Sequence, residues 1–121
     1  ITGGVYYPSA GSSTAGVVTF DTALYGPPAV QNGYMAMSSG IHLCSLKLSA
    51  YFTQTGLWNI EWRVNGNTMS KAATIAVIPG INTMDSSFMF KLAEGYIVQV
   101  YSDKGWGNAA VGNNLSCNLF M

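Results

Sequence analysis

The stretch LWNIEWRVNG, residues 57–66, constrains the fold more than any other part of the sequence. Its apolar and polar residues alternate with a period of two, which is the pattern of a strand with one buried and one wet face. Asn65-Gly66 closes the stretch, and this dipeptide suits the positive backbone angles of a tight hairpin. We therefore expect the chain to turn there and to return as a second strand through residues 67–78. The predicted core face carries Trp58, Ile60, Trp62 and Val64, and the wet face carries Asn59, Glu61 and Arg63, of which the last two can pair.

Runs of β-branched and aromatic residues recur between short segments rich in Gly, Asn, Ser and Pro, which is typical of an all-β domain. Residues 71–79 are Ala-rich, but their β-branched members favour a strand that Pro79 ends. We expect a single domain over residues 1–121, folded as a two-sheet antiparallel jelly-roll sandwich, in which residues 1–15 connect a stalk to the head. Further strands are predicted at residues 17–21, 34–37, 40–52, 87–92, 96–102 and 115–121.

The composition limits the partners that this domain can attract. Charged residues make up 8% of the chain, against roughly 25% in an average soluble protein, and the formal net charge is zero. We therefore expect no nucleic-acid partner and no membrane insertion, because the chain has neither a basic field nor an apolar run of roughly 20 residues. The two cysteines, Cys44 and Cys117, are too few and too far apart for a disulfide scaffold or a zinc site, and buried thiols are expected.

The residue types that catalysis requires are scarce. His42 is the single histidine, and it lies on the apolar face of the strand predicted at residues 40–52. We expect a hydrogen-bonded core histidine there and not the base of a hydrolytic triad. A jelly-roll metal enzyme of the cupin kind would require several histidine ligands. Asp85 and Asp103 stand near turns and form no dense acidic loop of the kind that binds calcium. We therefore predict no enzyme activity, no metal and no cofactor.

Four motifs, taken in their order along the chain, resemble the family of complement C1q globular heads and tumour-necrosis-factor-like (TNF-like) ligands. The resemblance covers most of the chain from about residue 17 onward. The motifs are Phe20-Asp21 on an early strand, Gly40 before a long strand, Leu92 with Gly95 at a turn, and Leu119-Phe120 in a short last strand. The departures are Tyr96, where the family usually has Asp, and His42 and Cys44, where it prefers aromatic residues.

The resemblance implies a jelly roll that assembles as a homotrimer around a three-fold axis. Its last strand would lie beside the long strand that follows Gly40, which places Cys44 and Cys117 on neighbouring strands as thiols. The apolar end of the chain would then be protected at the seam between subunits. Residues 96–102 carry bulk on both faces, so we expect something to cover that strand on its outside. The expected trimer interface comprises Ile97, Gln99, Tyr101, Leu119, Phe120 and Met121.

The segment of residues 101–114 has the composition of a binding loop. Trp106 stands between two glycines, with polar residues on both sides. Aromatic faces stack on sugar rings or protein side chains, and Asp and Asn supply directional hydrogen bonds. The alternative, which the sequence leaves open, is that Trp106 folds back to plug the end of the barrel or the trimer seam. The predicted ligand-binding residues are Tyr101, Asp103, Lys104, Trp106 and Asn108.

These features predict a non-enzymatic trimeric recognition head at the C-terminal end of a viral spike or fibre, with a bacteriophage as the expected source. The head would lie on the virion surface, bind a host-surface glycan or protein, and join a stalk or capsid protein through its N-terminus. The alternative is the trimerisation head of a secreted collagen-tailed protein or a surface structural protein, with an extracellular location. A third class, a carbohydrate-active enzyme or lectin monomer, requires a carboxylate pair or a single-chain sugar cleft.

Overall fold

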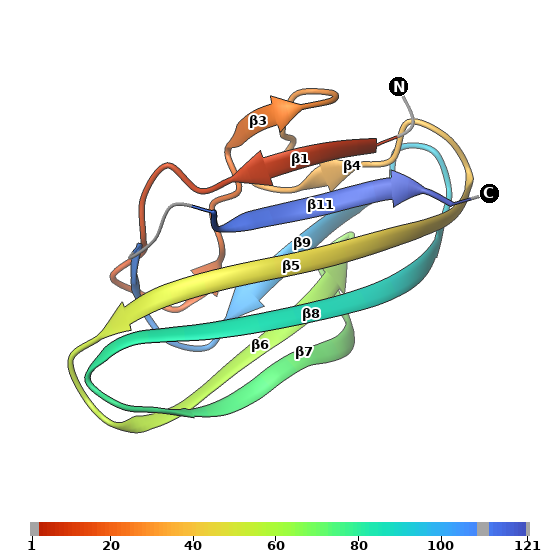
Figure 1. The fold of residues 1–121 in the computed structure, drawn as a ribbon. Helices are drawn as coiled ribbons and strands as arrows, with labels where there is room; N and C mark the ends of the chain where they lie inside the picture. Colours follow the sequence, from red (N-terminus) through yellow and green to blue (C-terminus); the bar gives the residue numbers. More distant parts are fainter. Residues whose placement is uncertain (1–2, 109–111, 121) are drawn as a thin grey trace.

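The chain folds into two antiparallel β-sheets packed face to face, in a computed structural model that describes residues 3–108 and 112–120 (Figure 1). This architecture confirms the two-sheet sandwich predicted from the alternating pattern. The described residues include no helix long and apolar enough to cross a membrane. The strands are β1 Gly3–Tyr7, β2 Gly16–Val17, β3 Thr22–Tyr25, β4 Tyr34–Met35, β5 Gly40–Phe52, β6 Gly56–Val64, β7 Asn67–Val77, β8 Gly80–Leu92, β9 Ile97–Ser102, β10 Gly107–Asn108 and β11 Asn114–Leu119.

Strand β5 runs through the six-stranded sheet and organises it. Strand β8 pairs with β5 along its whole length, from Gly40 opposite Leu92 to Phe52 opposite Gly80. Strand β11 pairs with the first part of β5 and the short β10 pairs with its end, while β1 lies between β11 and β3. The long strand predicted at residues 40–52 is confirmed with the same bounds. The strand predicted at 87–92 begins earlier than expected, at Gly80.

Strands β6 and β7 form the predicted hairpin in the five-stranded sheet. Asn65 and Gly66 have φ angles of 52° and 82°, the positive values that this two-residue turn requires. Strand β9 pairs with the other edge of β6, and both β2 and β4 pair with β9. Strands β2 and β4 are shorter than the strands predicted at residues 17–21 and 34–37.

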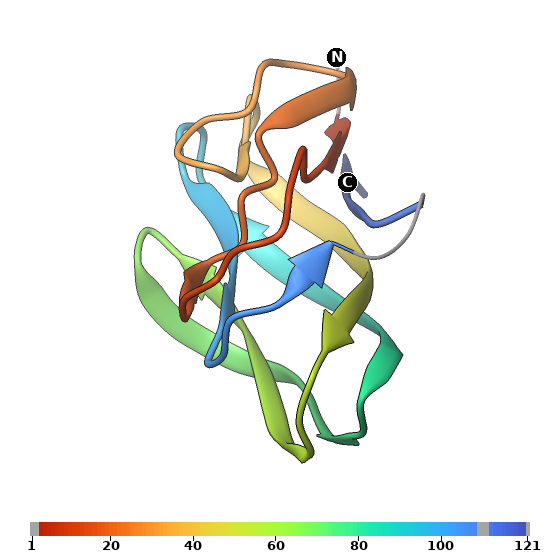
Figure 2. The ribbon, with the colours of Figure 1, turned by 90° about the vertical axis from the view of Figure 1, so that its left-hand side faces the viewer.

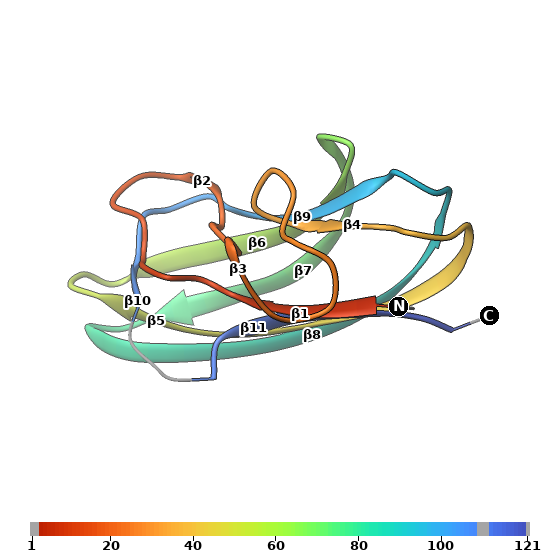
Figure 3. The same cartoon turned by 90° about the horizontal axis from the view of Figure 1, so that it is seen from above.

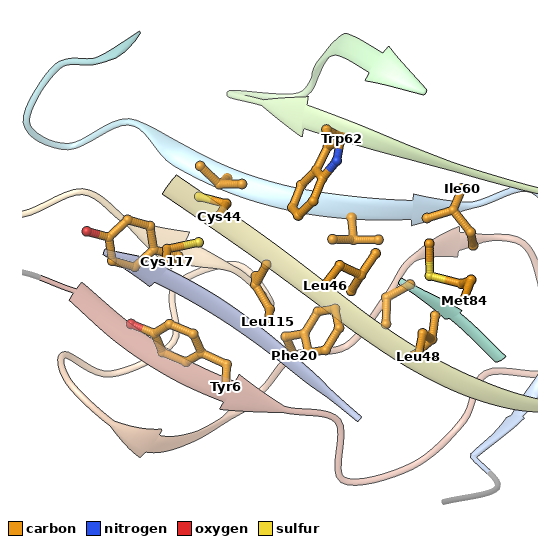
Figure 4. Packing of buried hydrophobic residues seen from close by; sticks show 14 of the residues in the cluster. Tyr6, Phe20, Cys44, Leu46, Leu48, Ile60, Trp62, Met84, Leu115 and Cys117 are labelled. Carbon is orange, nitrogen blue, oxygen red and sulfur yellow. The ribbon is translucent and has the colours of Figure 1, made fainter. Parts of the chain in front are cut away.

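The hydrophobic core lies between the two sheets (Figure 4). Trp58 and Trp62 of β6 are fully buried, as the alternation predicts. Their indole N–H groups donate to Ser102 Oγ at 3.0 Å and to Ser86 Oγ at 3.3 Å, so the burial of these polar groups is compensated. Figure 4 shows the packing between the sheets through Tyr6, Phe20, Cys44, Leu46, Leu48, Ile60, Trp62, Met84, Leu115 and Cys117.

Residues 3–7, predicted as part of a connection to a stalk, are instead a strand inside the six-stranded sheet. Strand β1 pairs with β11 along one edge and with β3 along the other. Tyr6 is fully buried, and its hydroxyl donates to Pro27 O at 2.9 Å. Burial raises the pKa of Tyr6 to about 12, so this donor keeps its proton at neutral pH. The prediction that residues 1–15 form a connector is therefore wrong for residues 3–7, where two glycines conceal the alternation.

Because β1 belongs to the folded sheet, Tyr6→Ala should lower the free energy of unfolding by about 3 to 5 kcal/mol, as removal of a large buried aromatic ring does. Tyr6→Phe should lower it by only about 1 kcal/mol, because the ring stays and only the hydrogen bond to Pro27 is lost. Urea denaturation followed by tryptophan fluorescence measures both changes. Negligible changes in both variants would mean that β1 lies outside the cooperative unit.

Candidate functional site

The outer face of the six-stranded sheet, turned away from the core, carries a group of exposed apolar side chains. Leu43 on β5 lies directly opposite Met89 on β8, and the two residues are 38% and 49% exposed. Phe120 lies two residues beyond Asn118, which is the other neighbour of Leu43, and it is 60% exposed. Its backbone N–H donates to Ile41 O at 2.6 Å, which keeps it beside β5. Ile41, Leu43, Met89 and Phe120 together are named the apolar strip.

Uncharged polar side chains form the middle of this outer face. Ser45 lies between Ser87 on β8 and Ser116 on β11, and the hydroxyl oxygens of Ser45 and Ser87 are 3.3 Å apart. The next row places Lys47 opposite Asp85, so two of the charges on this face have opposite signs. Apart from Lys91, which lies opposite Ile41, this face is apolar at one end and uncharged in the middle. Such a surface is inexpensive to desolvate against another protein surface.

The outer face of the five-stranded sheet has a different character. Glu61 Oε1 accepts hydrogen bonds from Arg63 Nε at 2.8 Å and from Thr68 Oγ1 at 3.1 Å, and the Glu61–Arg63 ion pair predicted from the sequence is confirmed. Asn59 Nδ2 donates to Asp103 Oδ2 at 2.7 Å on the same face. These polar side chains are hydrogen-bonded to one another, so covering them with a partner would gain little.

The predicted interface residues Ile97, Gln99 and Tyr101 belong to β9 in the five-stranded sheet. The guanidinium carbon of Arg63 lies 3.7 Å from the centroid of the Tyr101 ring, and Gln99 Nε2 donates to Gln31 O at 2.6 Å. The chain's own side chains and loops therefore cover this strand, which accounts for its bulk on both faces. These three residues lie on the opposite sheet from the last strand. Their contact with a sister subunit stays a prediction, in which they and the last strand would be two different patches of a head-to-tail interface.

Of the C-terminal residues in the predicted interface, Leu119 and Phe120 lie on opposite faces of the sheet. Leu119 pairs with His42, whose side chain is buried, and it therefore points to the core side of the sheet. Phe120 points to the outer face and belongs to the apolar strip. Met121 lies outside the described residues.

A pocket of about 690 Å³ opens at the end of the sandwich where β10 pairs with the last residues of β5. Figure 2 turns this end of the molecule toward the viewer, and Figure 3 shows β10 far from both chain ends. Phe52 and Trp106 contribute nearly buried side chains, whereas Tyr51 is 51% exposed. The residues lining this strand-end pocket are Gly11, Ser13, Tyr51, Phe52, Thr53, Gln54, Lys104, Gly105, Trp106, Gly107 and Asn108.

Three of the five predicted ligand-binding residues, Lys104, Trp106 and Asn108, line the strand-end pocket. Trp106 is only 5% exposed and is part of the core, so its indole presents no open face for stacking. Of the two alternatives that the sequence left open, the structure shows the indole folded back. The side chain of Asn108 is engaged within the protein, because its Nδ2 donates to Pro8 O at 3.2 Å.

The other two predicted ligand-binding residues lie outside the pocket. Tyr101 faces the outer side of the five-stranded sheet, and Asp103 Oδ1 accepts a hydrogen bond from Asn59 N at 2.8 Å. In their place the structure brings Tyr51 and Gln54 to the pocket. The sequence signal for Tyr51 was its position on the non-core face of a strand, where an aromatic ring stays accessible. No local pattern singled out Gln54.

His42 has the structural role that its position on the apolar face predicts. It is fully buried, and its Nε2 lies 2.9 Å from Ser38 O, which makes Nε2 the protonated nitrogen. Its Nδ1 then accepts a hydrogen bond from the Tyr34 hydroxyl at 3.1 Å. Across residues 3–108 and 112–120, no three His, Cys, Asp or Glu residues gather in a way that could hold a metal ion.

Cys44 and Cys117 lie directly opposite one another on β5 and β11, as the resemblance implied. Both are fully buried, and both are free thiols. Burial raises the pKa of the Cys117 thiol well above its ordinary value, and the adjacent Cys44 raises it further. Because the thiolate is the reactive form of cysteine, Cys117 is disfavoured as a nucleophile, and burial keeps both sulfurs away from reagents in water.

The fold, and not the sequence, relates this chain to known proteins. No family model matches the sequence, and no curated protein matches it. The structure is similar to that of Eiger TNF from S. frugiperda, with a TM-score of 0.67 and 12% sequence identity. The match covers 99% of this chain and 92% of that chain. At this identity the likeness establishes the fold, and the chain is a jelly roll of the TNF-like kind.

The two buried thiols predict a large difference in reactivity between the folded and the unfolded protein. With iodoacetamide and no reductant, the native chain should gain no adduct within minutes, because both sulfurs are buried. In guanidinium chloride both cysteines should react, and intact mass spectrometry counts the adducts. An unfolded chain that still failed to react would show that Cys44 and Cys117 are linked, contrary to this account.

Proposed function

We propose that this chain is a homotrimeric, non-enzymatic recognition head that assembles through the apolar strip on the outer face of its six-stranded sheet. The strip is the observation that carries the proposal, since Leu43, Met89 and Phe120 leave much of their surface exposed in the single chain. Contiguous exposed apolar surface on a soluble protein marks a site of association. TNF-like domains usually form homotrimers, which favours a closed ring of three copies.

The contrast between the two outer faces supports the choice of this surface. The five-stranded sheet exposes an internally bonded polar network that includes the Glu61–Arg63 pair. The six-stranded sheet exposes the apolar strip beside a neutral row of serines. A stable interface covers roughly 800 Å² on each partner, and a sheet six strands wide offers a continuous surface for such a contact.

The proposed location is the virion surface, at the C-terminal end of a spike or fibre, with the N-terminus leading to a stalk or capsid protein. The composition supports it: charge is scarce, Ser, Thr, Asn and Gly are frequent, and the two cysteines are free thiols and not the bridges common in extracellular domains. A bacteriophage source and a host-surface glycan or protein receptor complete the proposal. The role is binding without catalysis, and the buried His42 is consistent with it because both ring nitrogens are hydrogen-bonded.

The assembly surface is tested by placing a charge on the apolar strip. Leu43→Asp and Met89→Asp should each dissociate the trimer, because the desolvation of a carboxylate in the seam costs more than pairing with the neighbouring Lys91 returns. Analytical ultracentrifugation should then report the mass of one chain, with an unchanged circular dichroism spectrum, since neither side chain is part of the core.

Leu57→Asp is the matched control, because Leu57 is also well exposed but lies at the start of β6 in the other sheet. It should leave the trimer intact. Trimers that persist in both strip variants would contradict the proposed interface.

A further inference from the structure

The strand-end pocket opens where β10 pairs with the last residues of β5, and Figure 3 shows β10 far from both chain ends. In the proposed function the N-terminus leads into a stalk, so this end of the head points away from the stalk and toward the host surface. The inference below rests on the proposed function in this respect. The apolar strip contains Ile41 and Phe120, near the opposite end of β5, so assembly and the pocket use different residues.

The backbone wall of the pocket is fixed by the fold. Ser12 and Trp106 are joined by two backbone hydrogen bonds, Ser12 N to Trp106 O at 2.9 Å and Trp106 N to Ser12 O at 2.6 Å. Gly105 packs so closely that a Cβ there would collide with the carbonyl group of Ser13. A wall that is ordered in the free protein loses little conformational entropy when a ligand binds.

The polar groups of the pocket are available to a ligand. Thr53 and Gln54 are exposed, and neither side chain forms a hydrogen bond with another residue in the part of the chain that the structure describes. The ammonium group of Lys104 lies beside Gly56, just after Thr53 and Gln54 in the chain. A Cβ atom added to Gly56 would be only 2.9 Å from Lys104 Nζ. No carboxylate lines the pocket, and Lys104 has no ion-pair partner among the described residues. The pocket therefore carries one uncompensated positive charge beside unused hydrogen-bonding groups.

Tyr51 adds an accessible aromatic surface. It stands on the non-core face of β5, opposite Gly107 of β10, and half of it is exposed. Gly107 has no side chain to cover the neighbouring ring. A sugar presents a flat array of C–H groups that packs on such a ring, and its hydroxyls bond to the surrounding polar groups.

We infer that the strand-end pocket binds an acidic saccharide. The sugar ring packs on Tyr51, the carboxylate pairs with Lys104, and the hydroxyl groups bond to the side chains of Thr53 and Gln54. A volume of about 690 Å³ lies within the range of roughly 300 to 1,000 Å³ that small-ligand sites occupy. A single lysine suits one carboxylate, whereas a nucleic acid would require an extended series of basic residues.

The test applies the intact head to an array of oligosaccharides that end in uronic or sialic acid, printed beside their neutral counterparts. The head should bind acidic saccharides in preference to neutral ones. Titration with the strongest acidic saccharide should show affinity roughly tenfold weaker in Lys104→Gln, which loses a charge-assisted hydrogen bond, and in Tyr51→Ala, which loses the stacking surface. Lys71→Gln removes the same charge from the five-stranded sheet and should leave binding unchanged.

Two outcomes overturn the inference: no acidic saccharide binds, or binding is equal in the unaltered head, Lys104→Gln and Tyr51→Ala. The molar mass of the same samples separates this failure from failure of the proposed function. A trimer that binds no acidic saccharide overturns the pocket assignment alone. A monomer that binds one through Lys104 and Tyr51 supports the pocket and overturns the proposed assembly.

Discussion

The pairing of β5 with β8 along thirteen residues is the constraint on which the other features of the structure depend. Because side chains alternate along a strand, β5 contributes to the core on one face and to the outer surface on the other. The outer face carries Leu43 of the apolar strip near one end and Tyr51 of the strand-end pocket at the other. A register shift of one residue would exchange the two faces and bring Lys47 into the core, so packing of the core also fixes both proposed surfaces.

The two outer faces of the sandwich differ in the polarity of the side chains that they expose to water. On the five-stranded sheet, Arg63 and Thr68 both donate to Glu61 Oε1, and little is gained by covering these groups. On the six-stranded sheet, the apolar strip leaves hydrocarbon in contact with water, at a cost of about 25 cal/mol for each Å². Burial of that surface by identical copies is favourable, and the neutral polar residues beside it add little desolvation penalty. This difference favours the six-stranded sheet as the proposed assembly face.

The elements that the sequence predicted well are those with strong local patterns. The alternation in β6 and the Asn65-Gly66 turn are encoded within ten residues, and the structure reproduces both. Strand β1 was missed because glycines occupy its start, and the first half of β8 was missed because polar residues dominate it. The pocket could not be predicted, since it joins Gly11 and Ser13 to the segments 51–54 and 104–108, and only tertiary packing brings these together. Likewise, the bulky side chains on both faces of β9 predicted that something covers this strand on its outside. They did not predict that Arg63 and a loop of the same chain do so.

The central claim is that the apolar strip is covered by sister subunits, and the molar mass of the unaltered protein tests it most directly. Light scattering on a size-exclusion column, at micromolar chain concentration, reads this mass without reference to shape. The account predicts 38.7 kDa, three times the 12.9 kDa of one chain. A stable species of 12.9 kDa would contradict it, because Leu43, Met89 and Phe120 would then remain exposed in the protein as it exists in solution.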